Sequence, residues 1–175
     1  MLNQLLSSAA LAGRICAGLV FALAALDKMR HWRVLEGVIG NYRLLPSRLV
    51  RPAAYVLPPV ELALAAALLS GIMILPAAAA AMTLLLIFAL AMAINIRRGR
   101  DFIDCGCHQS FLRQTLKPAL VARNLLLTAL LSVSLASPLM PPAGPATIGV
   151  AAGLALFLLY LIANTVIALP VLNTA

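Results

Sequence analysis

The chain has 175 residues, of which 63% are hydrophobic and 10% are charged, whereas an ordinary soluble domain is about 45–50% apolar and about 25% charged. A soluble domain of this length cannot bury so much apolar surface, so the composition excludes soluble enzymes and DNA-binding modules. The net charge of +8 does not indicate a nucleic-acid partner, because apolar segments interleave the basic residues and membrane topology next to anionic lipid explains the charge better. The sequence therefore predicts an integral membrane protein whose surroundings are the lipid bilayer.

Five apolar segments are predicted to cross the membrane as helices, because each is close to the roughly 20 residues that span a hydrocarbon core of about 30 Å. The first is expected to be a retained helix rather than a signal peptide, since no basic residue precedes it and no clear cleavage site follows it. The fold expected is an all-α bundle in one polytopic domain, residues 1–175. Its spans are residues 5–26, 53–73, 76–96, 117–137 and 146–169.

The two longer loops, residues 27–52 and 97–116, are predicted to lie on the same side of the membrane. The other two connections are a tight turn near Gly71 and Pro76 and a proline-rich turn at residues 137–145, which must face the opposite side. Of the thirteen Lys and Arg residues, all except Arg14 fall in or next to the two longer loops. The positive-inside rule therefore predicts cytoplasmic basic loops and a periplasmic amino terminus.

The second longer loop contains the segment Asp104-Cys105-Gly106-Cys107-His108. Glycine between the cysteines permits a tight backbone, and a disulfide across one residue closes a small ring whose geometry departs from relaxed values. We therefore expect Cys105 and Cys107 to form an oxidising bond that is suited to exchange rather than to bracing. Because the loop is polar, the two thiols are also expected to be accessible.

Charged residues around this pair act in opposite directions. Arg100, its neighbours at 97 and 98, and His108 supply positive potential that favours a thiolate, whereas Asp104 and the acidic residue at 101 oppose it. Whether these charges together lower or raise the thiol pKa values is left open.

Two other interpretations of the pair are kept. In a metal site, Cys105, Cys107 and His108 are ligands with Asp104 or His31 as a fourth, although they lack the paired spacing of a structural zinc site. In the simplest interpretation the cysteines are small inert loop residues. Redox exchange is favoured, and no metal is predicted. The third cysteine, at position 16 in the first span, is expected to be a packed core residue, with a relay role as the alternative.

Charges within the predicted spans form a second candidate site. At about 1.5 Å per residue from the basic face, Glu61 lies roughly 12 Å deep and Arg123 roughly 9 Å deep, so we expect them to be partners, with Asn124 at a similar depth. Lys28 is expected to complement the carboxyl end of the first helix instead. The cluster is interpreted either as a structural ion pair, which is favoured, or as a site for protons or a quinone head group.

Four segments together carry a family resemblance. These segments are FALAALDKMRHWRVLEGVIGNYRLLP at 21–46, LPPVEL at 57–62, RRGRDFIDCGC at 97–107 and ARN at 122–124. They resemble the methylamine utilisation protein MauE family, within the wider DoxX-like membrane proteins. The resemblance implies a four-helix DoxX-like core plus one helix. One departure is that relatives in the wider family often continue the cysteine motif with Phe-Gly, where this chain has His108 and Gln109.

The resemblance also implies a function and partners. It implies a multi-pass protein of the bacterial inner membrane that supports processing, transport or maturation of the methylamine dehydrogenase beta subunit. Cys105 and Cys107 would be the exchanging pair, acting as a thiol–disulfide oxidoreductase with a thioredoxin-like MauD-type protein. The supporting residues expected are Asp104, His108, Arg100, Glu61, Arg123 and Asn124. Three alternatives remain: a quinone-linked thiol carrier without a dedicated client, a small-molecule transporter that uses Glu61 and Arg123, and a purely structural assembly partner that needs neither the cysteines nor the buried charges. No cofactor is predicted, and a quinone is left open.

Overall fold

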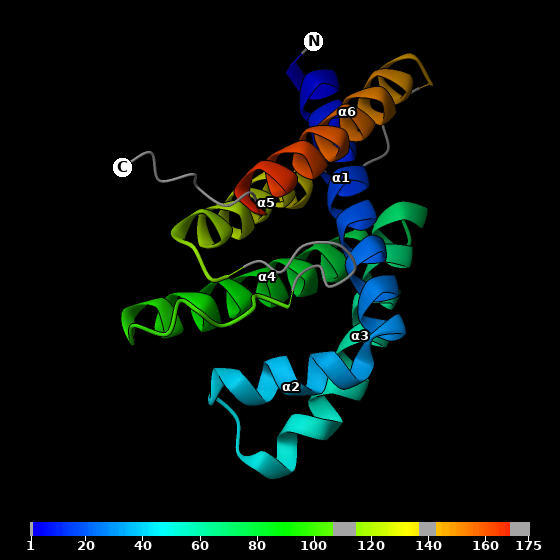
Figure 1. Ribbon diagram of the computed structural model, residues 1–175. Coiled ribbons are helices and arrows are strands. Elements are labelled where there is room, and N and C mark those ends of the chain that lie inside the picture. Colours follow the sequence, from blue (N-terminus) through cyan, green and yellow to red (C-terminus); the bar gives the residue numbers. More distant parts are fainter. Residues whose placement is uncertain (1, 107–114, 137–142, 169–175) are drawn as a thin grey trace, which may run out of the picture.

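The computed structural model describes residues 2–106, 115–136 and 143–168, and in these ranges the regular structure is entirely helical. Figure 1 shows the helices, with the remaining residues as a thin grey trace. The helices are α1 (Leu2–Arg30), α2 (Trp32–Tyr42), α3 (Ser47–Ser70), α4 (Ile74–Arg97), α5 (Pro118–Ala136) and α6 (Ala143–Ala168).

Five of these helices, α1, α3, α4, α5 and α6, are long and apolar enough to cross a membrane. The predicted all-α, multi-pass bundle is therefore confirmed. The boundaries differ in one respect that matters for the site, because α1 continues to Arg30 instead of ending at residue 26. The end of α1 therefore carries Lys28 into the bundle.

The predicted first loop contains a helix, α2, so the prediction of a loop is wrong for residues 32–42. Apolar residues recur along it at helical spacing, at Leu35, Val38, Ile39 and Tyr42, which is the pattern of one apolar helix face. Leu35 and Val38 are buried, and α2 packs against α3. Figure 1 shows α2 between the end of α1 and the beginning of α3.

Helix α1 is central to the packing, since it contacts α3, α5 and α6. Small residues allow its close approach to α6. A Cβ atom added at Gly153 would lie 2.8 Å from the Cβ of Ile15, and one added at Gly149 would lie 3.0 Å from the Ser8 carbonyl oxygen. Glycines four residues apart are a known basis for tight helix pairing in membranes. The fifth span is therefore closely packed against the first.

Contacts between the two longer loops confirm that both lie on one side. The Arg100 Nη2 group donates a hydrogen bond to the Asn41 carbonyl oxygen at 2.8 Å. The Tyr42 hydroxyl donates to the Cys105 carbonyl oxygen at 3.2 Å. The carboxyl end of α6 lies at the same face, because Lys117 Nζ donates to the Ile167 carbonyl oxygen at 2.8 Å. The turn at Gly71, in the left-handed conformation with φ 75°, ends α3 at the opposite face.

Candidate functional site

The cysteine loop has an ordered stem. The Leu116 amide donates hydrogen bonds to the carbonyl oxygens of Asp101 at 2.9 Å and Ile103 at 3.1 Å, and Asp104 forms an antiparallel bridge with Thr115. These bonds bring the two ends of the loop together. Of the predicted pair, Cys105 lies next to this stem, and Cys107, like His108, lies outside the described residues.

Cys105 is buried, with 8% of its surface exposed, and this corrects the expectation of an accessible thiol at this position. It packs in an apolar cluster with Met92 of α4, Leu120 of α5 and the stem residues Ile103 and Leu116. The apolar stem residues, which are dispersed in the polar sequence of the loop, bring Cys105 down onto the helices. The thiol therefore faces the bundle rather than open solvent.

Gly106 lets the loop lie directly on α2. Its φ is +69°, a conformation that side chains with a Cβ rarely adopt. An added Cβ would also lie 2.8 Å from Val38 Cγ1. Glycine is thus required twice at this position, by the backbone conformation and by the contact with α2.

Arg100 connects the loop to two helices. Besides its bond to the Asn41 carbonyl oxygen at the end of α2, its Nη1 group donates to Asn95 Oδ1 of α4 at 3.4 Å. Asn95 is fully buried and donates to the Ala91 carbonyl oxygen at 3.1 Å. Arg100 therefore joins the cysteine loop to α2 and α4. In the same loop, Asp104 Oδ1 is buried and has no hydrogen-bond partner among the residues described.

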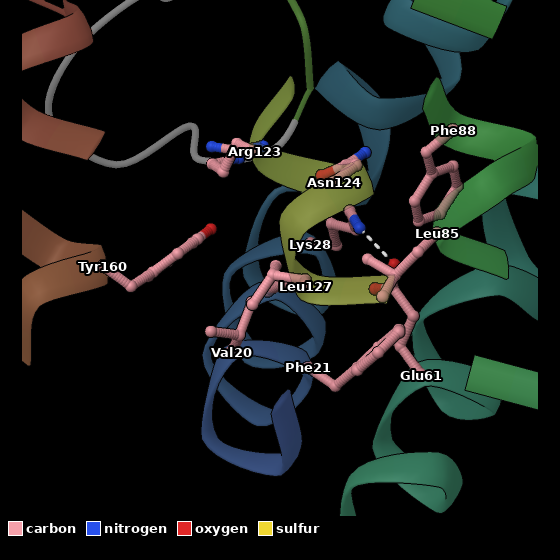
Figure 2. A pocket seen from close by; sticks show the side chains of 11 residues that line it. Val20, Phe21, Lys28, Glu61, Leu85, Phe88, Arg123, Asn124, Leu127 and Tyr160 are labelled. Carbon is pink, nitrogen blue, oxygen red and sulfur yellow. Dashed lines mark hydrogen bonds and ion pairs between the residues drawn. The ribbon is translucent and has the colours of Figure 1, made fainter. Parts of the chain in front are cut away.

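The buried acid of α3, Glu61, forms an ion pair with Lys28 of α1, and both side chains are buried. Figure 2 shows Lys28 directed at Glu61, with the Phe88 ring beside them. The prediction of Arg123 as the ion-pair partner of Glu61 is corrected by this contact. The cause is the extra turn of α1, which brings Lys28 to the depth of Glu61 instead of leaving it at a helix end.

Arg123 of α5 forms a different set of contacts. Its Nη1 group donates a hydrogen bond to Asn164 Oδ1 of α6, and its guanidinium lies 5.5 Å from the centre of the Tyr160 ring. In Figure 2, Tyr160 extends from α6 towards Arg123. Arg123 thus joins α5 to α6, and the neighbouring Asn124 is buried with its Nδ2 atom unpaired among the described residues.

These polar groups surround a small cavity of about 40 Å³, lined by Lys28, Glu61, Arg123, Asn124 and Tyr160 together with apolar side chains. A water molecule needs roughly 10–15 Å³ of such space, so the cavity has room for a few waters. Sites for small organic molecules are typically about 300–1,000 Å³. The cavity is thus smaller than a typical site of that kind.

A second cavity, of about 470 Å³, lies between α2, α3 and α4 under the cysteine loop. Its walls are almost entirely apolar, and Cys105 and Gly106 line one part of it. Lys28 and Phe88 line both cavities. The sequence analysis did not predict this cavity, because it depends on α2, which was taken as a loop.

The remaining candidate residues lie apart from these cavities. Cys16 is buried in the main apolar core, as expected. His31 contacts Asp27 through Nδ1 at 3.4 Å. Arg14 is buried, and its Nε donates to the Leu68 carbonyl oxygen at 3.4 Å. Within the described residues, no group of three or more His, Cys, Asp or Glu side chains is arranged to hold a metal ion.

Comparisons with known proteins cover both candidate sites. A family model described as methylamine utilisation protein MauE matches residues 6–137. The methylamine utilization protein MauE of Paracoccus denitrificans is 45% identical over 93% of this chain and 89% of its own length. Proteins of the same name from Paracoccus versutus and Methylorubrum extorquens are 45% and 41% identical, over 86% and 81% of this chain and 83% and 78% of their own lengths. No solved structure matches the chain.

Proposed function

This chain belongs to the methylamine utilisation protein MauE family, and on that basis we propose that it supports maturation of the methylamine dehydrogenase beta subunit by thiol–disulfide exchange at Cys105 and Cys107. The observation that carries the proposal is the position of Cys105. An ordered loop stem, Gly106 and the Tyr42 hydrogen bond hold it against the bundle, and the thiol borders a large cavity.

The exchange chemistry needs only the pair and a client dithiol. A client thiolate attacks one sulfur of the Cys105–Cys107 disulfide, forms a mixed disulfide and releases the other cysteine as a thiolate. The second client thiolate then attacks its own half of the mixed disulfide. One disulfide is broken and one is formed, so the client is oxidised by two electrons and the pair is reduced by two. Isomerisation begins with the reverse of the second step, in which a thiolate of the pair attacks a client disulfide, forms a mixed disulfide and releases a client thiolate. Another client thiolate then attacks the client sulfur of the mixed disulfide, which forms a different client disulfide and releases the thiolate of the pair.

A partner protein is part of this proposal. If the basic loops are cytoplasmic, the pair lies about 30 Å of bilayer away from a periplasmic client, which is too far for direct exchange. A thioredoxin-like protein of the MauD type, or a relay within the membrane, then has to carry the electrons. If the loops are periplasmic, the pair can meet the client or MauD directly.

Serine substitutions test the function. Serine is close to cysteine in size but cannot undergo thiol–disulfide exchange, so Cys105→Ser and Cys107→Ser are each expected to abolish maturation as fully as the double substitution. The measurement is the amount and disulfide state of the beta subunit during growth on methylamine, at matched membrane levels of each variant. Cys16→Ser is the matched control and is expected to leave maturation unchanged. A normal beta subunit in the double variant would overturn the proposal and favour a purely structural role in assembly.

A further inference from the structure

The large cavity is placed and shaped for a ligand that comes from the membrane. Its volume of about 470 Å³ falls in the range of roughly 300–1,000 Å³ that small-molecule sites occupy. Its side walls are the membrane-spanning helices α3 and α4, and the apolar face of α2 contributes Leu35, Val38 and Ile39.

The cavity is open on its lipid side. Val56 and Val60 of α3 and Ile87 of α4 line it, yet they expose 58%, 43% and 54% of their surfaces. These residues belong to helices that are long and apolar enough to cross a membrane, so an apolar molecule dissolved in the bilayer has a route to the cavity between α3 and α4. A water-soluble substrate would find almost no polar group along these walls.

Among the described residues that line the cavity, the polar side chains are Lys28, Tyr42 and Cys105. Cys105 lies at the loop side, and Lys28, ion-paired to Glu61, lies at the boundary with the small polar cavity. The aromatic ring of Phe88 is part of the wall next to Lys28. An occupant that matches this layout has an apolar chain, a flat ring and hydrogen-bond acceptors on the ring.

From this layout we infer that the cavity binds a membrane quinone, with the ring near Cys105 and Lys28 and the chain towards the lipid opening between α3 and α4. A phospholipid fits less well, because its phosphate would have to lie in an apolar cavity where the cationic group among the described lining residues, Lys28, is already paired with Glu61. The choice of a quinone rests on the proposed thiol function, since that function needs an acceptor for the electrons taken from client thiols.

The electron balance is complete with this one reagent. Re-oxidation of the reduced pair breaks two S–H bonds, forms the Cys105–Cys107 bond and releases two electrons and two protons. The quinone takes up the two electrons and two protons, and its two carbonyl oxygens become the hydroxyl groups of a quinol. No metal or further oxidant enters the step.

Binding can be measured through the single tryptophan of the chain, Trp32. Its ring lies 4.8 Å from that of Tyr55, beside the cavity-lining Val56, and a bound quinone ring quenches tryptophan fluorescence. The full-length protein in detergent is titrated with decylubiquinone, and with 1-decanol as a chain of the same length without the ring. We expect saturable quenching by the quinone, with decanol competing weakly.

Two cavity-filling variants and one control make the test specific. Ala91→Phe on α4 and Ala53→Phe on α3 place a ring inside the cavity and are expected to weaken decylubiquinone binding by about tenfold or more. Ala80→Phe, at an exposed position of α4 outside the cavity lining, should leave binding unchanged. If Ala91→Phe does not yield folded protein, the binding test relies on Ala53→Phe.

The outcomes separate this inference from the proposed function. Equal quenching in all variants, or full competition by decanol, would overturn the quinone site whatever the role of the cysteines. Saturable binding, together with normal client maturation in the cysteine variants, would leave the quinone site standing and overturn the thiol function.

Discussion

The ammonium group of Lys28 lies 5.1 Å from the centre of the Phe88 ring while it is ion-paired with Glu61. A cation over an aromatic face gains about 0.5–2 kcal/mol, more when water is excluded. The two side chains also line both the polar and the apolar cavity. Lys28 and Phe88 therefore mark the boundary between the buried charges of the bundle and the apolar space under the cysteine loop.

The Lys28–Glu61 pair is expected to stabilise the bundle as a unit. Removing one member of a buried ion pair typically costs about 3–5 kcal/mol, because an uncompensated charge stays in a medium of low dielectric constant. Glu61→Gln should therefore lower the thermal unfolding temperature and membrane accumulation, and Glu61→Gln combined with Lys28→Met should recover part of the loss.

The control for this pair is Asp101→Asn, which removes an exposed acid and should have little effect. The sequence predicted Arg123 as the partner of Glu61, and a result in favour of that pair would contradict the present prediction. If Arg123→Gln restores the Glu61→Gln protein and Lys28→Met does not, then the functional partner of Glu61 is Arg123.

Gly106 is expected to keep the Cys105 loop seated on α2. Gly106→Ala forces a Cβ both into a left-handed conformation and against Val38, at a cost of about 1–3 kcal/mol from the backbone alone. The loop should lift, and Cys105 should react several times faster with a maleimide in a Cys16→Ser, Cys107→Ser background.

Gly99 provides a matched control for Gly106. It has a similar φ of +67° but nothing within 4 Å of an added Cβ, so Gly99→Ala carries the backbone cost without the contact with α2. Adding Val38→Ala to Gly106→Ala removes the Val38 Cγ1 atom that the new Cβ would meet. The double variant should therefore react with the maleimide more slowly than Gly106→Ala alone. Equal labelling rates for Gly99→Ala and Gly106→Ala would mean that the contact does not hold the loop.

Close packing of α6 on α1 is expected to depend on Gly153. Gly153→Val would drive a branched side chain into Ile15 and the Ala12 carbonyl oxygen, which lie 2.8 Å and 2.9 Å from an added Cβ. Overpacking of this kind usually costs about 1–3 kcal/mol, and thermal unfolding in detergent should report it. Gly144→Val, where an added Cβ has open space, should change the unfolding temperature far less.

The orientation of the bundle can be tested with reporter fusions. Because the two longer loops contact one another and contain nearly all the basic residues, we expect both to be cytoplasmic. Fusions after Arg48 and Gly99 should be active with a cytoplasmic reporter, and a fusion after Gly71 should be active with a periplasmic one. The opposite pattern would refute the charge argument and place Cys105 on the periplasmic side.

The sequence by itself determined the class of fold and the candidate groups. Long apolar segments allow only membrane-spanning helices, since the backbone must satisfy its own hydrogen bonds in hydrocarbon, and the five spans follow from length and hydropathy. Short turns and charge placement also predicted that the two longer loops share a side. Rare charges in the spans identified Glu61 and Arg123 as notable, because such charges are costly there.

Only the tertiary structure decided which groups meet. The partner of Glu61 depends on where α1 ends, and one extra turn of helix replaces Arg123 with Lys28. The burial of Cys105 and the apolar cavity depend on α2, whose apolar face becomes meaningful only when α3 and the cysteine loop pack against it. Spacing along the chain sets the depth of each residue in the membrane, but helix rotation and contacts between distant segments set its neighbours.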